Sequence, residues 1–197
     1  RSRGLGDVYK RQHSFFSHIL NSFKHRAEEL GYDISFISDH MGGQEISYVD
    51  HARYRNCDGV VIASVDYTEH AVVDLANSGI PVVNFDVDVD CQGIYKVTGD
   101  NYDMGYQSAK YITEKVGPAA NIVVMDVPSS GSVCELRKQG FYDYLKEVGY
   151  DESNIFEVQL ESFARDKGLA GMADVLEAHP QIDAVFSMDD ETSMGAI

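Results

Sequence analysis

The feature that most constrains this fold is the alternation of short apolar runs with helix-length amphipathic segments. The central run is Ile80–Asp86, IPVVNFD, where a proline is followed by mostly apolar residues and then by a carboxylate. A strand of this kind is typical of a parallel sheet that helices cover on both faces. The short connections between successive segments predict a doubly wound α/β architecture.

The alternation runs through two similar blocks. The first block predicts helices at 14–31, 44–56 and 68–77, and strands at 33–38, 59–64 and 80–86. The second predicts strands at 94–98, 121–127, 155–160 and 182–188, and helices at 102–116, 132–148 and 165–178. We therefore expect two Rossmann-like lobes with parallel sheets, at 13–100 and 101–197, whose strand ends face one cleft.

The two ends do not look like natural ends. Residues 1–12, RSRGLGDVYKRQ, do not fit the pattern that follows and resemble translated sequencing-adapter read-through. We leave them out of the fold, as one would a cloning scar. Because the chain stops at Ile197, just inside a new helical pattern, we expect a fragment that is truncated at both ends.

The charge balance excludes several classes of partner. The chain has 16 Lys and Arg against 32 Asp and Glu, a net charge of -16. Nucleic acids, anionic lipid surfaces and polyanionic substrates require a basic face, whereas neutral ligands remain open. The three cysteines and seven histidines show no metal-ligand spacing. We predict no metal site and no cofactor.

Acidic residues follow two of the predicted strands. Asp86 stands where a ligand-binding group would stand in such a sheet, and a turn cap is the open alternative. The D-x-D-x-D pattern that begins there fails as a calcium loop at Cys91 and Val97. At 189–191, DDE, one acid is expected to cap the next helix and the others are free for ligand or solvent.

The remaining chemistry favours binding over catalysis. The serines at 129–132 lack a G-x-S-x-G elbow, and no nucleophile is paired with a base. Carboxylates, a guanidinium and aromatic faces together suit a neutral polyhydroxylated ligand such as a sugar. The candidate ligand-binding residues are Phe15, Phe16, Asp86, Arg137, Phe163 and Asp189.

Several motifs resemble one family when they are read in order over 13–197. They are SFF at 14–16, DGVVI at 58–62, GIPVVNFD at 79–86, GDN at 99–101, ELRKQGF at 135–141, SFARDKG at 162–168 and EAHPQIDAVFSMDDETSMGA at 177–196. This series resembles the type I periplasmic sugar-binding proteins of ABC transporters, the ribose-binding protein and its relatives.

The resemblance implies a role for each candidate residue. Phe15 and Phe16 match the aromatic pair beside the sugar ring, and Phe163 matches an aromatic residue of the second lobe. Asp86 matches the aspartate that accepts hydroxyls, and Arg137 matches the arginine that reaches sugar oxygens. The resemblance further implies that Gly99, Asp100 and Asn101 form part of the hinge, and that Asp189 stands where an Asn is usual.

The sequence also departs from the family pattern at three more positions. His13 replaces the Asn before the aromatic pair, Val87 stands where ribose binders carry Arg, and Ala63 stands where they carry Asn. These changes argue against ribose itself as the ligand.

The implied function is the substrate-binding component of a sugar ABC transporter. It would be a monomer that binds a small sugar and a membrane permease, in the periplasm or on the extracellular face, with or without a lipoprotein anchor. The alternative is the effector domain of a lac-repressor-type regulator, which would be cytoplasmic. Gly117-Pro118-Ala119 departs from the Gly-His-Arg turn usual in those regulators and favours the transporter.

Overall fold

The computed structural model describes residues 14–63, 69–86, 91–128 and 132–197. Its N-terminal elements, up to residue 97, are the helices α2 (Ser14–Glu29), α3 (Tyr48–Tyr54) and α4 (Glu69–Asn77), and the strands β1 (His40–Met41), β2 (Gln44–Glu45), β3 (Val60–Ile62), β4 (Val82–Phe85) and β5 (Ile94–Val97). Its C-terminal elements are the helices α5 (Asn101–Val116), α6 (Ser132–Glu147), α7 (Arg165–Ala178) and α8 (Asp190–Ala196), and the strands β6 (Ile122–Asp126), β7 (Ile155–Gln159) and β8 (Ala184–Ser187).

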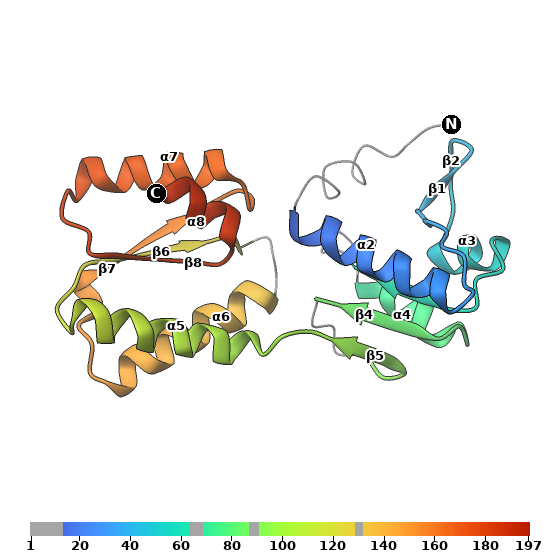
Figure 1. Ribbon diagram of the computed structural model, residues 1–197, viewed down its shortest axis with the longest axis horizontal. Coiled ribbons are helices and arrows are strands. Elements are labelled where there is room, and N and C mark those ends of the chain that lie inside the picture. The colour runs from blue at the N-terminus through green and yellow to red at the C-terminus, as the bar shows by residue number, and fades with distance from the viewer. Residues whose placement is uncertain (1–13, 64–68, 87–90, 129–131) are drawn as a thin grey trace. The chain divides into compact units, whose positions relative to one another are not determined.

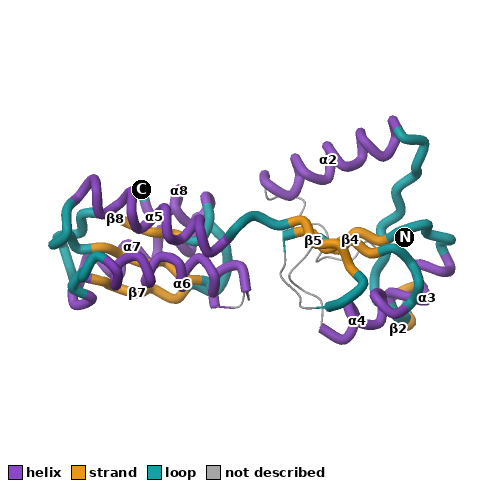
Figure 2. Tube along the Cα trace, turned by 90° about the horizontal axis from the view of Figure 1, so that it is seen from below, coloured by secondary structure: helices purple, strands orange, loops and turns teal. Residues whose placement is uncertain are grey.

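The first sheet has the strand order β3-β4-β5. Figures 1 and 2 label β4 and β5 of this sheet. The Val60 amide, at the start of β3, donates to the Pro81 carbonyl just before β4, at 2.9 Å. The Asp86 amide, just after β4, donates to the carbonyl of Val97 at the end of β5, also at 2.9 Å. Because starts pair with starts and ends with ends, the three strands are parallel, as the apolar character of β4 predicted.

The structure corrects two predictions before this sheet. Residues 33–38 form no strand; each of them is exposed or only partly buried, and the backbone of Ser38 is hydrogen bonded to Nδ1 of the buried His51. The predicted helix at 44–56 is also wrong in its first part. Gly42 and Gly43 both have positive φ, which suits a two-residue turn joining the antiparallel β1 and β2. Helix α3 begins only after Ser47, whose hydroxyl accepts from the Asp50 amide.

The second sheet has the order β7-β6-β8, with both pairings parallel. In Figure 1, α7 and α8 cover one face of this sheet, and α5 and α6 cover the other. Strand β6 is therefore central and covered on both sides, and all five of its residues are buried. The carboxyl ends of the strands and the starts of α6, α7 and α8 lie at one end of the sheet, as parallel crossovers require.

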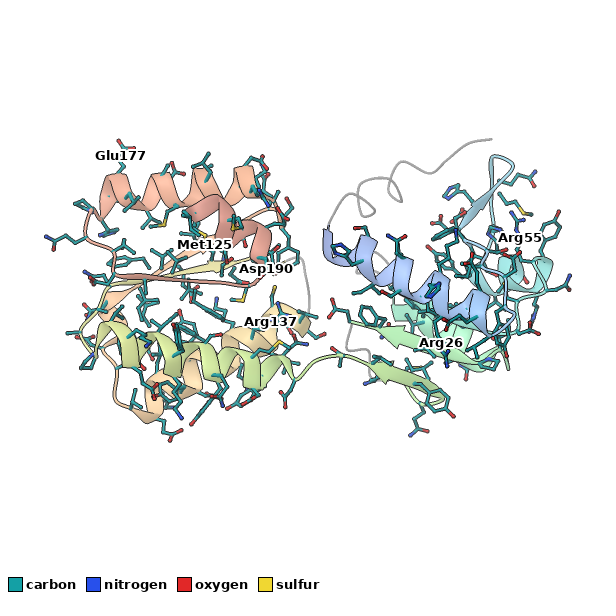
Figure 3. All side chains as sticks on the ribbon, in the orientation of Figure 1. Arg26, Arg55, Met125, Arg137, Glu177 and Asp190 are labelled. Carbon is teal, nitrogen blue, oxygen red and sulfur yellow. The ribbon has the colours of Figure 1, made fainter. Side chains whose placement is uncertain are left out.

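The main buried cluster lies between these layers and is drawn from Ala109 onward. Met125 of β6, labelled in Figure 3, is fully buried. The rings of Phe141 on α6 and Phe186 on β8 stack with centroids 4.2 Å apart. Burial of such large side chains is the dominant stabilising contribution to a domain of this kind.

Glycines let the helices on each face touch backbone to backbone. A Cβ placed on Gly105 of α5 would lie 1.8 Å from the Arg137 carbonyl oxygen of α6. A Cβ on Gly168 of α7 would lie 2.2 Å from the Thr192 carbonyl oxygen of α8. Any side chain at these positions would push the paired helices apart.

The described chain divides into two compact units. One consists of 14–60, 69–82 and 91–93, and the other of 61–63, 83–86 and 94–197 without the gap at 129–131. The lobe boundary after residue 100 remains a prediction.

Candidate ligand-binding site

Asp86 directly follows the end of β4, and its backbone is unusual. Its φ is +60°, in the left-handed region that side-chain-bearing residues other than Asn and Asp rarely adopt. Burial raises the pKa of the Asp86 carboxyl, while the positive charge of Arg137, in the same compact unit, acts to lower it. A partly buried carboxylate at a strand end, with its pKa shifted by burial, is a candidate for a binding group.

Arg137 lies near the start of α6 (Figure 3). Its Nε donates to Oδ1 of Asn101 at 2.9 Å, and its Nη1 donates to the Met188 carbonyl oxygen. Both partners are neutral, and none of the carboxylates in the described ranges lies within 4 Å of the guanidinium. A half-buried guanidinium without a carboxylate retains positive potential and unused N–H donors for a ligand.

Of the predicted hinge residues, Gly99 and Asp100 lie between β5 and α5, and Asn101 is the first residue of α5. Asp100 is the N-cap of α5, because its side chain accepts from the Asp103 amide at 2.9 Å. Asn101 is 3% exposed, and its Nδ2 donates to Thr98 Oγ1 and to the Gly99 carbonyl oxygen. Sequence reasoning gave Asn101 only a hinge role and missed its contact with Arg137. The one signal for that contact was an amide opening a helix beside a predicted strand end.

Asp189 is the acid that caps the helix after β8, which confirms the prediction that one acid of 189–191 does so. Its carboxylate accepts from the Glu191 and Thr192 amides, each at 3.1 Å, and from the Thr192 hydroxyl. The fold therefore uses both oxygens of the residue that the resemblance assigned to the ligand. The Met188 carbonyl beside it accepts from Arg137, which brings Arg137 and Asp189 to the same strand end.

The aromatic candidates are less well defined by the structure. Phe163, between β7 and α7, is partly buried and packs against the main cluster. Phe15 and Phe16 belong to the first turn of α2, but their side chains are outside what the structure describes. The candidate calcium loop at 86–90 and the serines at 129–131 lie largely outside the described residues, as do His13 and Val87.

Metal binding finds no support in this part of the molecule. Across the described residues, His, Cys, Asp and Glu side chains form no group of three or more that could hold a metal ion. The groups that do converge near the carboxyl end of β8 are a guanidinium, a capped carboxylate, an amide and a carbonyl. Such an assembly can exchange hydrogen bonds with a neutral, oxygen-rich ligand.

The parallel sheets, with polar groups at their strand ends, define an α/β protein of the doubly wound class. The family model for the periplasmic binding protein domain matches residues 8–197. The chain belongs to this family.

Two curated relatives are named as sugar import binding proteins. The ribose import binding protein of Bacillus subtilis is 27% identical over 188 residues, which cover 93% of this chain and 60% of the relative. The D-apiose import binding protein of Actinobacillus succinogenes is 26% identical over 187 residues, covering 92% and 60%. The chain thus spans about 60% of the length of these curated relatives.

The chain shares its fold with solved structures of both transporter proteins and regulators. A periplasmic ribose ABC transporter protein from Conexibacter woesei has a TM-score of 0.75 at 21% identity, covering 94% of this chain and 63% of that one. A LacI-family transcriptional regulator from Burkhoderia phymatum has a TM-score of 0.74 at 19% identity, covering 93% and 67%. These likenesses confirm the predicted type I fold. None of the described helices has the length and apolar character that a membrane crossing requires.

Proposed function

We propose that this chain is the substrate-binding component of a sugar ABC transporter and not an enzyme. The observation that carries the proposal is the Arg137 guanidinium, which is held in place by two neutral oxygens and keeps N–H donors for a ligand. The family match and the names of the sugar-import relatives support the same ligand class. Asp86, Asp189, Phe15, Phe16 and Phe163 would complete the site, with a membrane permease as the partner of the loaded protein, which we expect to be a periplasmic or extracellular monomer.

The ligand would be a neutral monosaccharide. Arg137 would donate to ring and hydroxyl oxygens, while Asp86 would accept from hydroxyls. Sugar binding would stabilise the ligand-bound arrangement and shift the population toward the form that the permease recognises. The raised pKa of Asp86 fits this role, because a carboxylate that burial penalises gains from hydroxyl donors that replace lost water.

Isothermal titration calorimetry of the chain completed from its gene, with D-ribose, D-apiose and D-allose, tests this proposal. We expect at least one sugar to bind, and Arg137→Ala and Asp86→Asn each to weaken that binding by about a hundredfold, since each loses hydrogen bonds of a charged group. Arg165→Ala is the matched control, because Arg165 is exposed and pairs with Glu191 at 2.6 Å. Absence of binding across a broad panel of monosaccharides would rule out the sugar ligand.

The second candidate is the effector domain of a lac-repressor-type regulator, which the regulator likeness supports. The DNA immediately upstream of this coding region separates the two. A signal peptide or lipoprotein cysteine is expected for the transporter. A helix-turn-helix in frame would establish the regulator instead.

A further inference from the structure

Helix α5 contacts Arg137 at two points that are one turn apart. Asn101 and Gly105 are spaced i and i+4, so they lie on the same face of α5. Asn101 Oδ1 accepts from the Arg137 side chain. Gly105, which has no side chain, lets the Arg137 backbone pack directly against α5, where a Cβ would collide with the Arg137 carbonyl oxygen. The position of α5 therefore determines where both ends of the arginine lie.

Both the oxygen and the nitrogen of the Asn101 side-chain amide form hydrogen bonds. Its oxygen holds Arg137, while its Nδ2 donates to Thr98 Oγ1 at 3.4 Å and to the Gly99 carbonyl at 3.3 Å. These two partners belong to the segment that leads from β5 into α5. Since Asn101 is 3% exposed, water competes little for these hydrogen bonds.

These contacts orient the Arg137 guanidinium but do not use all of its N–H donors. Of the five N–H donors of a guanidinium, Nε–H goes to Asn101 and one Nη1–H goes to Met188, so three remain for a ligand. Fixing the plane of the fork in advance lowers the entropy lost when a ligand binds.

We infer that Asn101 is a positioning residue for the ligand-binding arginine: it fixes the guanidinium and couples it to residues 98–99. This inference rests on the proposed function for its consequence in sugar binding, but the coupling itself is a property of the unliganded protein. A change in the backbone of 98–99 is thereby transmitted to Arg137 through one side chain.

The test combines a spectroscopic measurement with an affinity measurement on the full 197-residue chain. In ¹⁵N NMR spectra, the Nε–H of Arg137, assigned by its loss in Arg137→Lys, should exchange slowly with water. Asn101→Ala should lose this slow exchange and weaken sugar binding by about tenfold. Asn101→Asp keeps an acceptor for Nε–H and should retain the signal, which separates positioning from a general folding defect.

Gln107→Ala on the same helix is the control, because Gln107 contacts only the exposed Asp103 among its side-chain hydrogen bonds on described residues. An unchanged Nε–H signal in Asn101→Ala would overturn the inference. So would a lost signal with unchanged sugar affinity. If the wild-type chain binds no sugar, the proposed function fails, and the NMR comparison still decides whether Asn101 fixes Arg137.

Discussion

Strands β4 and β6 are both mostly apolar but have different surroundings. Each is the central strand of a three-stranded parallel sheet. All five residues of β6 are buried, whereas in β4 Val82 and Asn84 are buried while Val83 and Phe85 are only partly so. Both faces of β6 are therefore buried, whereas in β4 every second residue is only partly buried.

The same contrast extends to the cores around the two strands. The buried apolar residues of the N-terminal elements are small or aliphatic, namely Ala52, Val60, Val72, Leu75 and Val82. Several described aromatic residues there are exposed, such as Phe36 at 54% and Tyr95 at 74%, whereas Phe141 and Phe186 are buried in the C-terminal region. The comparison shows that local apolar patterning selects a strand, while the density of long-range partners decides how far the strand is buried.

Matched leucine truncations test this contrast with the largest expected effect. Leu145 on α6 is fully buried and Leu75 on α4 is 3% exposed. We expect Leu145→Ala to lower the free energy of unfolding of the C-terminal region by about 4 kcal/mol, and Leu75→Ala to cost about 2 kcal/mol, because a looser core collapses around the cavity. Hydrogen exchange followed by mass spectrometry measures both regions separately. Equal costs would remove the distinction.

Glycine substitutions test whether close helix approach or side-chain packing limits the C-terminal region. We expect Gly105→Ala to cost about 3 kcal/mol, because its Cβ meets the backbone carbonyl of Arg137. Gly171→Ala is the control: it lies in a helix as well, but its Cβ meets only side-chain carbons of Val158 and Leu160, at 2.9 Å. Urea unfolding should give the smaller loss for Gly171→Ala. The reverse order would show that side-chain packing limits this region more than helix approach does.

The acids at the ends of β4 and β8 should have opposite effects on stability. Asp189 caps α8 with both carboxylate oxygens, so Asp189→Ala should cost about 1 kcal/mol. Asp190→Ala, one residue later in the first turn of α8, is the control and should cost less. Thermal unfolding monitored by circular dichroism measures both. Equal losses would show that the cap contributes nothing beyond the helix dipole.

At the end of β4, replacing Asp86 with Asn should stabilise the unliganded protein. The gain in the free energy of unfolding should be smaller than the losses caused by the core substitutions. The folded pKa of Asp86 is raised above 3.8, so its favourable contribution is present below the unfolded pKa and is lost as pH rises through the folded value. Asp86→Asn keeps a residue that tolerates φ of +60° and cannot ionise. Its stability relative to wild type should therefore increase as pH rises above the ordinary pKa of an aspartate, which urea titrations at several pH values measure. A difference that stays constant with pH would contradict the effect of burial on this carboxyl.

The sequence predicted the elements of the C-terminal region well, because each has a strong local signal. Helix α7 has the predicted bounds, and β6 and β7 differ from prediction by a residue or so at their ends. The errors fall at 33–38 and 44–56, where the local pattern is weak. The Gly42-Gly43 pair is typical of a hairpin turn, but the prediction did not include one. A strand at 33–38 would have needed neighbours that the pattern alone could not supply.

For the candidate site, sequence reasoning found single residues better than their contacts. The cap at 189–191 was predictable because capping is local in sequence. The hydrogen bond between Asn101 and Arg137 joins residues 36 positions apart, and no periodicity signals such a pair. Whether Phe15, Phe16 and Phe163 contact a ligand remains a prediction.

The backbone of Asp86 has a practical consequence for anyone who would turn this chain into a biosensor. A library that randomises residue 86 will be sorted first by tolerance of a positive φ, which costs most side chains about 1–2 kcal/mol, and only then by fit to a new analyte. Asn, Asp and Gly would dominate the survivors whatever the target. Retargeting should therefore begin at positions with ordinary helical geometry, such as Arg137.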